Sequence, residues 1–140
     1  MNFKEIPITE LIPQQKPFVF VEELIYCDNK KCETAFTINE DIIFLKSDKF
    51  QEPGLVENIA QTCATLIGFY NKFTNQGNIK LGFIGGIKNL QILRMPEIGE
   101  RLNTIVETVA DIGPAKIANA TIYSNGEIIA TGEMKIFEQE

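Results

Sequence analysis

Residues 53–62, with the sequence PGLVENIAQT, open the one long segment of this chain that has helical periodicity. Proline suits the first turn of a helix, because that N–H group has no intrahelical partner, and Pro53 therefore predicts a helix start. Glu57 follows one turn later among apolar neighbours. A carboxylate on an apolar helix is costly to bury unless it is paired or has a function. The segment predicts a helix whose free N–H groups and single inward acid form a candidate site for chemistry on a carbonyl.

The helix is predicted to span residues 53–74. A track of small residues, Ala60, Ala64 and Gly68, recurs along it at four-residue spacing, and small residues let a helix lie close to a sheet. The helix should end within residues 75–77, because glycine suits the terminal left-handed position. Apolar side chains at helical spacing are Leu55, Val56, Ile59, Cys63, Leu66, Ile67 and Tyr70.

Two strands are predicted before the helix, over residues 17–27 and 32–39, with a turn at 28–31 between them. Residues 5–14 are predicted to form a short helix or turn bounded by prolines. Residues 40–52 are predicted to be irregular. The expected core residues here are Ala35, Phe36 and Ile38, together with the apolar group Ile42, Ile43, Phe44 and Leu45, which should pack under the helix start.

Only strands are predicted after the helix, over residues 79–94, 100–111, 115–123 and 127–137. Ser124-Asn125-Gly126-Glu127 indicates a hairpin turn. Glycines 82, 85 and 86 lie inside the first of these strands and indicate a bulge or a close backbone approach. Two strands, one long helix and four further strands favour an α+β fold, with one antiparallel sheet curled around the helix in a single domain over residues 1–140.

The composition narrows the classes of function. The formal net charge of −6 argues against binding nucleic acid through a basic face. No run is apolar enough to span a bilayer and no signal peptide is evident, so we expect a cytoplasmic protein. The chain has no histidine, which removes His-dependent triads, His-ligated metal sites and the usual general base near neutral pH. We therefore expect neither a metal nor a cofactor.

The three cysteines are dispersed and do not form a zinc site. Cys27 and Cys32 flank the predicted turn and could face each other across a hairpin, but a disulfide there is not expected in a cytosolic chain. Cys63 lies on the apolar helix and is expected to be a small core residue.

The order of several short motifs resembles that of hot-dog-fold proteins, and more narrowly that of the 3-hydroxyacyl-acyl-carrier-protein dehydratases of fatty-acid synthesis. The resemblance runs from about Leu11 to Phe137 and implies a hot-dog fold, in which an antiparallel β-sheet wraps around one long central α-helix. The first motif, Ile12-Pro13-Gln14-Gln15-Lys16-Pro17-Phe18, resembles the family opening Leu-Pro-His-Arg-x-Pro-Phe. The others are Thr37-Ile38-Asn39-Glu40 before the catalytic loop, Pro53-Gly54 with Glu57-Asn58-Ile59-Ala60-Gln61 at the helix start, Gly86-Ile87-Lys88-Asn89, Arg94, and Gly99-Glu100-Arg101-Leu102.

The chain departs from the pattern of this family in two ways. The catalytic loop of the family carries a histidine in a His-Phe-Pro setting, whereas residues 42–52 hold no histidine. The spacing between Pro-Gly and the helix glutamate is also shorter than in the family. The resemblance therefore implies a divergent branch, closer to the dehydratase-like proteins of aryl-polyene and polyketide-type pathways.

The resemblance implies that Glu57 is the helix carboxylate that moves a proton on a thioester-bound 3-hydroxyacyl chain, a reaction that needs an acid and a base. The backbone N–H groups of Gly54 and Leu55 would polarise the thioester carbonyl. Gln61 would orient Glu57 or a loop carbonyl. The alternative is that Glu57 is a buried carboxylate kept for structure by such hydrogen bonds. The residues expected to contact substrate are Gly54, Leu55, Asn58, Gln61, Phe83, Ile84 and Gly85.

Several polar groups are candidates to replace the missing histidine. They are Ser47, Asp48, Asn58 and Tyr70, of which only Asp48 is a second acid in the loop. An Asp48–Glu57 pair would supply two carboxylates, and simple solvation of the loop is the competing explanation for Asp48.

The resemblance also implies that residues 83–86 lie near a two-fold partner and line an acyl tunnel. An unpaired edge strand independently favours a homodimer or a higher even oligomer. The leading prediction is a dehydratase that acts on thioesters of acyl carrier protein or coenzyme A, and it requires a second proton-transfer group within reach of Glu57. A non-catalytic acyl-binding or partner subunit would need only an open tunnel. A thioesterase, the third alternative, would need room for a water molecule beside Glu57.

Overall fold

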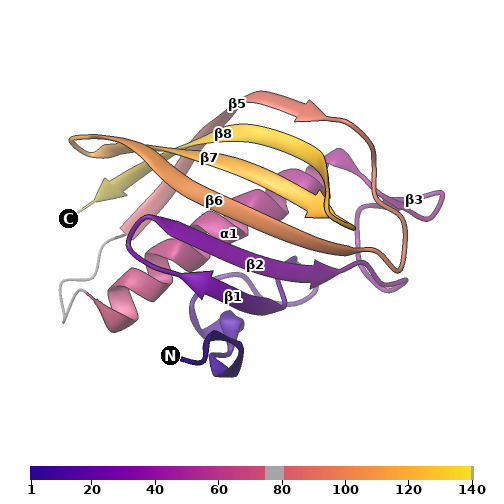
Figure 1. Ribbon diagram of the computed structural model, residues 1–140, viewed down its shortest axis with the longest axis horizontal. Coiled ribbons are helices and arrows are strands. Elements are labelled where there is room, and N and C mark those ends of the chain that lie inside the picture. Colours follow the sequence, from indigo (N-terminus) through magenta and orange to yellow (C-terminus); the bar gives the residue numbers. More distant parts are fainter. Residues whose placement is uncertain (75–80, 140) are drawn as a thin grey trace.

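A six-stranded antiparallel sheet curls around one long helix in the computed structural model, which describes residues 1–74 and 81–139 (Figure 1). The strand order is β1-β2-β6-β7-β8-β5, so β1 and β5 are the two edge strands, and β3 pairs with β4 in a separate small hairpin. The strands are β1 (Glu23–Cys27), β2 (Lys31–Thr37), β3 (Leu45–Lys46), β4 (Lys49–Phe50), β5 (Leu81–Ile92), β6 (Arg101–Ile112), β7 (Ala115–Ser124) and β8 (Glu127–Gln139). The helices are the 3₁₀ turns Phe3–Glu5 and Ile8–Glu10 and the long helix α1 (Glu52–Phe73).

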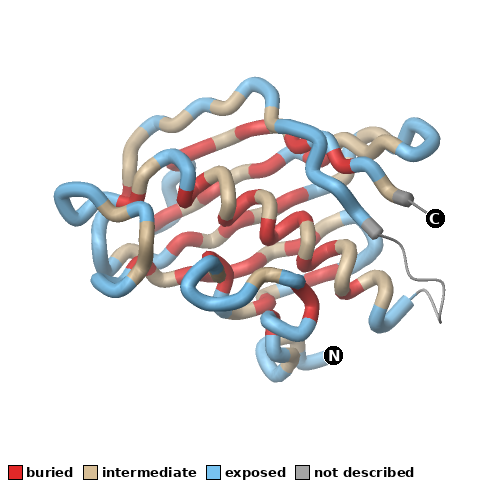
Figure 2. The backbone as a smooth tube through the Cα atoms, turned by 180° about the vertical axis from the view of Figure 1, so that it is seen from behind, coloured by how far each residue is buried: buried red, intermediate tan, exposed pale blue. Residues whose placement is uncertain are grey.

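Helix α1 confirms the predicted central helix to within one residue at each end. Pro53 stands in its first turn, as expected. The predicted end within residues 75–77 lies outside the described residues. Figure 2 shows the helix lying across one face of the sheet, with buried positions on the strands beneath it. None of the described residues form a helix that is both long and apolar enough to cross a membrane.

The prediction that the track of small residues faces the sheet is wrong. A Cβ atom at Gly68 would lie 2.0 Å from the backbone oxygen of Leu11, so this side of the helix meets the N-terminal segment. Ala60 and Ala64 are half-buried on the same side. The side that faces the sheet instead carries larger residues, including Asn58, whose polar groups are satisfied by hydrogen bonds.

The first predicted strand begins later than expected, at Glu23 rather than residue 17. Residues 17–22 form no strand and run past α1, because side chains of the helix take over their backbone hydrogen bonds: Gln61 bonds to Phe18 and Phe20, and Asn58 bonds to Phe20. An apolar, β-rich sequence cannot distinguish such a segment from a strand, since here helix side chains rather than a neighbouring strand pair the backbone of Phe18 and Phe20.

The loop predicted as irregular over residues 40–52 contains the short β3–β4 hairpin. Its turn passes through Ser47 and Asp48, whose φ angles are 53° and 62°. Phe44 and Phe50 from this loop pack with Phe20, with ring centroids 5.6 Å apart in both pairs. The expected apolar packing under the helix start is therefore present.

The four predicted C-terminal strands are all confirmed, with shifts of up to two residues at their ends. Asn125 and Gly126 adopt φ angles of 54° and 77°, as a two-residue hairpin turn requires. The register of β5 shifts between Ile84 and Gly86, which confirms the bulge. The predicted alternation of β8 is wrong at its start, where Ile128 is exposed and Ile129 is buried.

Polar side chains join α1 to the sheet inside the core. Thr104 on β6 donates to Asn58 Oδ1 at 2.5 Å, and Asn58 Nδ2 donates to the backbone oxygen of Phe20 at 2.7 Å. The hydroxyl oxygens of Thr62 and Thr34 on β2 lie 2.8 Å apart. All four polar side chains are fully buried, so each hydrogen bond replaces one that water would otherwise supply.

The cysteines are free thiols, all of them buried. Cys27 and Cys32 are directly opposed in the β1–β2 pair, so the hairpin predicted around them is confirmed without a disulfide. Cys63 lies in the core as predicted, and burial raises the pKa of its thiol to about 12.

Glu100 lies in the loop before β6 and connects this loop by hydrogen bonds to the turn of the β7–β8 hairpin. Its carboxylate accepts two hydrogen bonds from Arg94, at 2.8 and 3.0 Å, one from the Glu97 N–H and one from the Ser124 hydroxyl. The hydrogen bonds from Arg94, with smaller contributions from Glu97 and Ser124, lower the pKa of Glu100 to about 2.

Replacing Glu100 with glutamine should lower the free energy of unfolding at pH 7 by about 2 kcal/mol, because a bidentate charged pair is lost. A carboxylate with a lowered pKa stabilises the fold fully above its unfolded value of 4.5, and this contribution disappears as the pH falls through 4.5 toward about 2. Urea unfolding at pH 7 and pH 3 should therefore show a smaller difference between wild type and variant at pH 3. An equal difference at both values would contradict this account.

Candidate functional site

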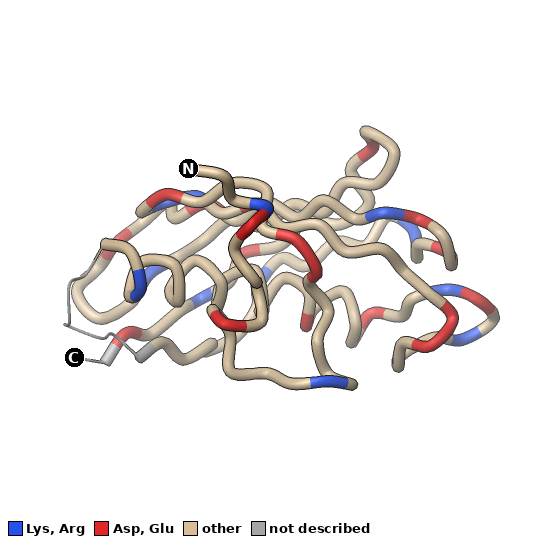
Figure 3. The backbone as a smooth tube through the Cα atoms, turned by 90° about the horizontal axis from the view of Figure 1, so that it is seen from below, with Lys and Arg blue, Asp and Glu red and all other residues tan. Residues whose placement is uncertain are grey.

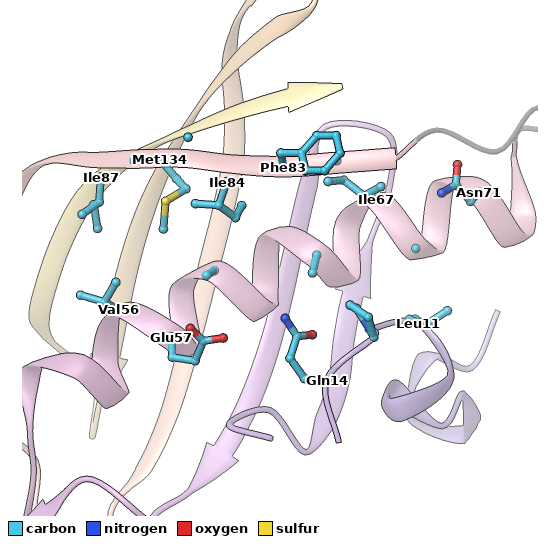
Figure 4. Close-up of a pocket in the computed structure, with 17 residues that line it drawn as sticks. Leu11, Gln14, Val56, Glu57, Ile67, Asn71, Phe83, Ile84, Ile87 and Met134 are labelled. Atoms are coloured by element: carbon cyan, nitrogen blue, oxygen red, sulfur yellow. The ribbon is translucent and has the colours of Figure 1, made fainter. Parts of the chain in front are cut away.

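A groove of about 720 Å³ runs along α1 between the N-terminal segment and the edge strand β5 (Figure 4). The small side chains of Ala60, Ala64 and Gly68 form part of its lining, and residues 82–87 of β5 form another part. The lining is mainly apolar, and the volume is in the range of pockets that hold small molecules. The groove extends from Glu57 to Asn71, which is about 20 Å along a helix.

Glu57 lies at the end of the groove nearest the helix start, and its carboxylate is directed into the groove in Figure 4. The side chain is half-buried. It is the sole ionisable group among the described residues that line the groove. Residues 58–71 of the helix carry no Asp, Glu, Lys or Arg, whereas elsewhere on the molecule Lys and Arg are interspersed with Asp and Glu (Figure 3).

Gln61 holds the Glu57 carboxylate from one turn along the helix. Its Nε2 donates to Glu57 Oε1 at 3.2 Å and to the backbone oxygen of Phe18 at 2.7 Å, while its Oε1 accepts from the Phe20 N–H at 2.7 Å. Gln61 is fully buried, so these three bonds fix its amide. The arrangement is the one expected of a residue that orients both Glu57 and a loop carbonyl.

Glu57 also borders a second hollow of about 550 Å³ at the start of α1. The rings of Phe18 and Phe44 line this hollow together with Pro53. Val56 and Glu57 belong to both hollows, so the carboxylate lies where the two meet.

Gly54 and Leu55 do not line the groove. Both are buried, and a Cβ atom at Gly54 would lie 2.2 Å from the ring of Phe50, which explains the small residue there. Their N–H groups donate to the backbone oxygen of Gln51 at 3.0 and 3.2 Å. These groups are therefore not free in this structure, and their role in polarising a carbonyl stays a prediction.

The structure does not bring the proposed substitutes for histidine together with Glu57 in the groove. Asn58 is buried against the sheet, Ser47 and Asp48 form the turn of the β3–β4 hairpin, and Tyr70 lines a separate small cavity near the end of α1. The structure therefore gives no support to an Asp48–Glu57 pair.

Phe83, Ile84 and Gly85 line the groove on the β5 side. Strand β5 pairs with β8 on one side only, and Phe83 and Ile84 are 54% and 41% exposed. An exposed apolar edge strand favours pairing with another chain. The groove thus opens beside the edge where a second subunit would bind.

Several groove residues were absent from the sequence prediction, among them Gln14, Val56 and Met134. One of them could have been found from the sequence, because Gln14 stands where the opening motif of the resembling family has a histidine. The track of small residues could also have indicated the groove, since small side chains leave space for a ligand as well as for a sheet.

Comparison with known proteins bears on the fold and the family of this chain. The family model described as ApeP-like, ApeP dehydratase, matches residues 6–140. The 3-hydroxyacyl-[acyl-carrier-protein] dehydratase FabZ of Exiguobacterium sibiricum is 30% identical over 133 residues, which cover 91% of this chain and 92% of that protein. These matches confirm the predicted resemblance to the dehydratases.

Solved structures show the same fold. The dehydratase heterocomplex ApeI:P from Xenorhabdus doucetiae superposes with a TM-score of 0.84 at 17% identity, covering 96% of this chain and 92% of that chain. A hypothetical thioesterase with coenzyme A from Streptococcus pneumoniae superposes with a TM-score of 0.71 at 9% identity, covering 84% of each chain. The predicted hot-dog fold is confirmed.

Proposed function

The chain belongs to the ApeP-like dehydratase family, and on that premise we propose that Glu57 is the group that removes water from a 3-hydroxyacyl thioester bound in the groove. The observation that carries the proposal is the position of Glu57, which is the sole ionisable side chain among the described residues of an otherwise apolar groove. An apolar groove suits the methylene groups of an acyl chain. A carboxylate at its end suits proton transfer at the carbons next to the thioester.

The reaction breaks a C2–H bond and the C3–O bond, forms a double bond between C2 and C3, and releases water. The Glu57 carboxylate takes the C2 proton, which the neighbouring thioester carbonyl makes more acidic. The resulting carboxylic acid then protonates the departing 3-hydroxyl and returns to a carboxylate. One carboxylate can serve both transfers if the two groups leave from the same face. The hydrogen bond from Gln61 holds one carboxylate oxygen in place throughout.

The two hollows that meet at Glu57 suggest how the substrate lies. The acyl chain would extend along the groove toward Asn71, and the thioester would lie beside Glu57. The arm that links it to acyl carrier protein or coenzyme A would leave through the hollow between Phe18 and Phe44. A second subunit paired along β5 in a homodimer would cover the open side of the groove.

The absence of histidine supports a second candidate function, that of a partner subunit. The described lining holds one ionisable group, whereas dehydration that follows the family pattern uses two. The related structure named as the dehydratase heterocomplex ApeI:P contains two different subunits. In this alternative a different hot-dog subunit would pair along β5 and supply the second group.

The deciding experiment incubates the purified chain with 3-hydroxydecanoyl thioesters of acyl carrier protein and of coenzyme A, and follows the products by mass spectrometry. We expect water loss without hydrolysis of the thioester. Binding without turnover would overturn independent catalysis and favour the partner-subunit function. Hydrolysis to the free acid would overturn both and make the protein a thioesterase.

A further inference from the structure

Phe44 has a backbone conformation that is costly for phenylalanine. Its φ angle is 66°, in the left-handed region, where the Cβ atom of a residue other than glycine is crowded by the following carbonyl oxygen. The conformation has a structural purpose, because the Phe44 carbonyl accepts a hydrogen bond from the Gln51 N–H at 2.9 Å and so closes the base of the β3–β4 hairpin. Glycine or asparagine would meet that requirement at a lower cost. The phenyl ring therefore needs a separate explanation.

Packing inside the protein explains only part of this ring. It contacts Phe20 with ring centroids 5.6 Å apart, yet Phe44 remains 39% exposed. Phe18, which lines the same hollow at the start of α1, is 56% exposed. Two exposed rings beside one hollow leave apolar surface in contact with water, and a ligand that covers them gains free energy. Strained residues are also concentrated at sites that bind ligands.

The charges around the hollow limit what can bind there. The described part of its lining includes Glu52 and Glu57 but no Lys or Arg. Two carboxylates repel an anion such as phosphate, whereas their oxygens can accept hydrogen bonds from N–H groups. The hollow thus suits an uncharged ligand that has apolar segments and amide N–H groups.

The pantetheine arm, which carries acyl groups in both coenzyme A and acyl carrier protein, has this chemistry. Next to the sulfur it consists of methylene groups and amides, and it is uncharged. Its place follows from the two hollows, since Val56 and Glu57 line both of them. An acyl chain in the groove, with its thioester beside Glu57, leaves the hollow of Phe44 for the arm. This step rests on the proposed function.

We propose that the ring of Phe44 binds the pantetheine arm of the substrate and selects acyl groups that are attached to this arm. The left-handed backbone of Phe44 fixes where the ring lies, and the arm covers the exposed part of the ring. The contact does not distinguish coenzyme A from acyl carrier protein, because both present the same uncharged segment next to the sulfur. Phe44 transfers no proton, so it contributes to binding and not to the chemical step.

The test compares two ligands that cannot react. One is the 3-hydroxydecanoyl pantetheine analogue in which an amide replaces the thioester, and the other is the N-methylamide of 3-hydroxydecanoic acid, which has the same acyl chain and no arm. Titration calorimetry would measure their affinities for wild type and variants, and thermal unfolding would check the fold of each protein. Wild type should bind the pantetheine ligand more tightly. We expect Phe44→Ala to weaken that binding by about 10-fold and to change binding of the N-methylamide by less than about 2-fold.

Two further variants separate the ring from a general effect on the fold. Phe44→Tyr keeps the ring and should keep the wild-type affinity for both ligands. Phe73 at the end of α1 is the matched control, because it is 42% exposed, its ring packs against Phe69 with centroids 4.9 Å apart, and it lines neither hollow. Phe73→Ala should change neither affinity.

Three results would overturn this inference and leave the proposed function standing. The first is a wild-type protein that binds both ligands equally well. The second is a folded Phe44→Ala protein that prefers the pantetheine ligand as strongly as wild type does. The third is an equal loss of affinity for both ligands, which would assign the ring a structural role. A wild-type protein that binds neither ligand would overturn the proposed function and this inference together.

Discussion

Glu57→Gln should reduce the rate of water loss from a 3-hydroxyacyl thioester by about 100- to 10,000-fold, the usual contribution of a positioned acid–base group. Glutamine has nearly the same shape and can still accept the hydrogen bond that Gln61 donates. It cannot take a proton from C2, so catalysis should be lost while the groove remains. Steady-state kinetics with 3-hydroxydecanoyl-coenzyme A should show the loss mainly in kcat.

Glu107→Gln is the matched control, because Glu107 is an exposed glutamate on β6 and does not line the groove. It should keep the wild-type rate. The thermal unfolding midpoints of both variants should lie close to that of wild type, since Glu57 is only half-buried. Water loss that continues undiminished in a folded Glu57→Gln protein would show that another residue performs the chemistry.

Asn58→Ala should lower the free energy of unfolding by about 3 kcal/mol, a large effect for a single polar residue. The change leaves the Thr104 hydroxyl and the backbone oxygen of Phe20 buried without their partner, and it opens a small cavity. Because Phe20 belongs to the segment that Gln61 also holds, residues 17–22 should become more susceptible to proteolysis. Urea unfolding and limited proteolysis would measure the two effects.

Asn119→Ala provides the comparison, since Asn119 is exposed on β7 and its loss should change stability by less than about 0.5 kcal/mol. A similarly small effect of Asn58→Ala would mean that water or the sheet satisfies the groups that Asn58 now pairs. The polar network would then contribute little to holding α1 against β6.

Local chemistry explains why much of this protein was predictable. The helix start at Pro53, the turn at Asn125-Gly126 and the alternating C-terminal strands each depend on neighbours in the chain, and each is present. The order of these elements, together with the motifs around Glu57, was sufficient to predict the hot-dog fold and its dehydratase relatives. Glu57 itself was identifiable because an acid on an apolar helix requires an explanation.

The tertiary structure decided what the side chains of the helix contact. The periodicity of α1 does not say which side meets the sheet, and the small-residue track borders the groove and the N-terminal segment instead. Residues 17–22 are apolar and β-rich like a strand, yet Asn58 and Gln61 pair the backbone of Phe18 and Phe20, because a partner distant in the sequence decides where a hydrogen bond forms.

The candidate site was likewise predictable from the sequence only in part. The sequence by itself singled out Glu57 as an acid on an apolar helix, and it contains no histidine that could assist this group. Only the fold could bring Gln14, forty-three residues away in sequence, to the same groove as Glu57. That juxtaposition depends on packing between segments distant in the sequence, and a motif read along the chain does not contain it.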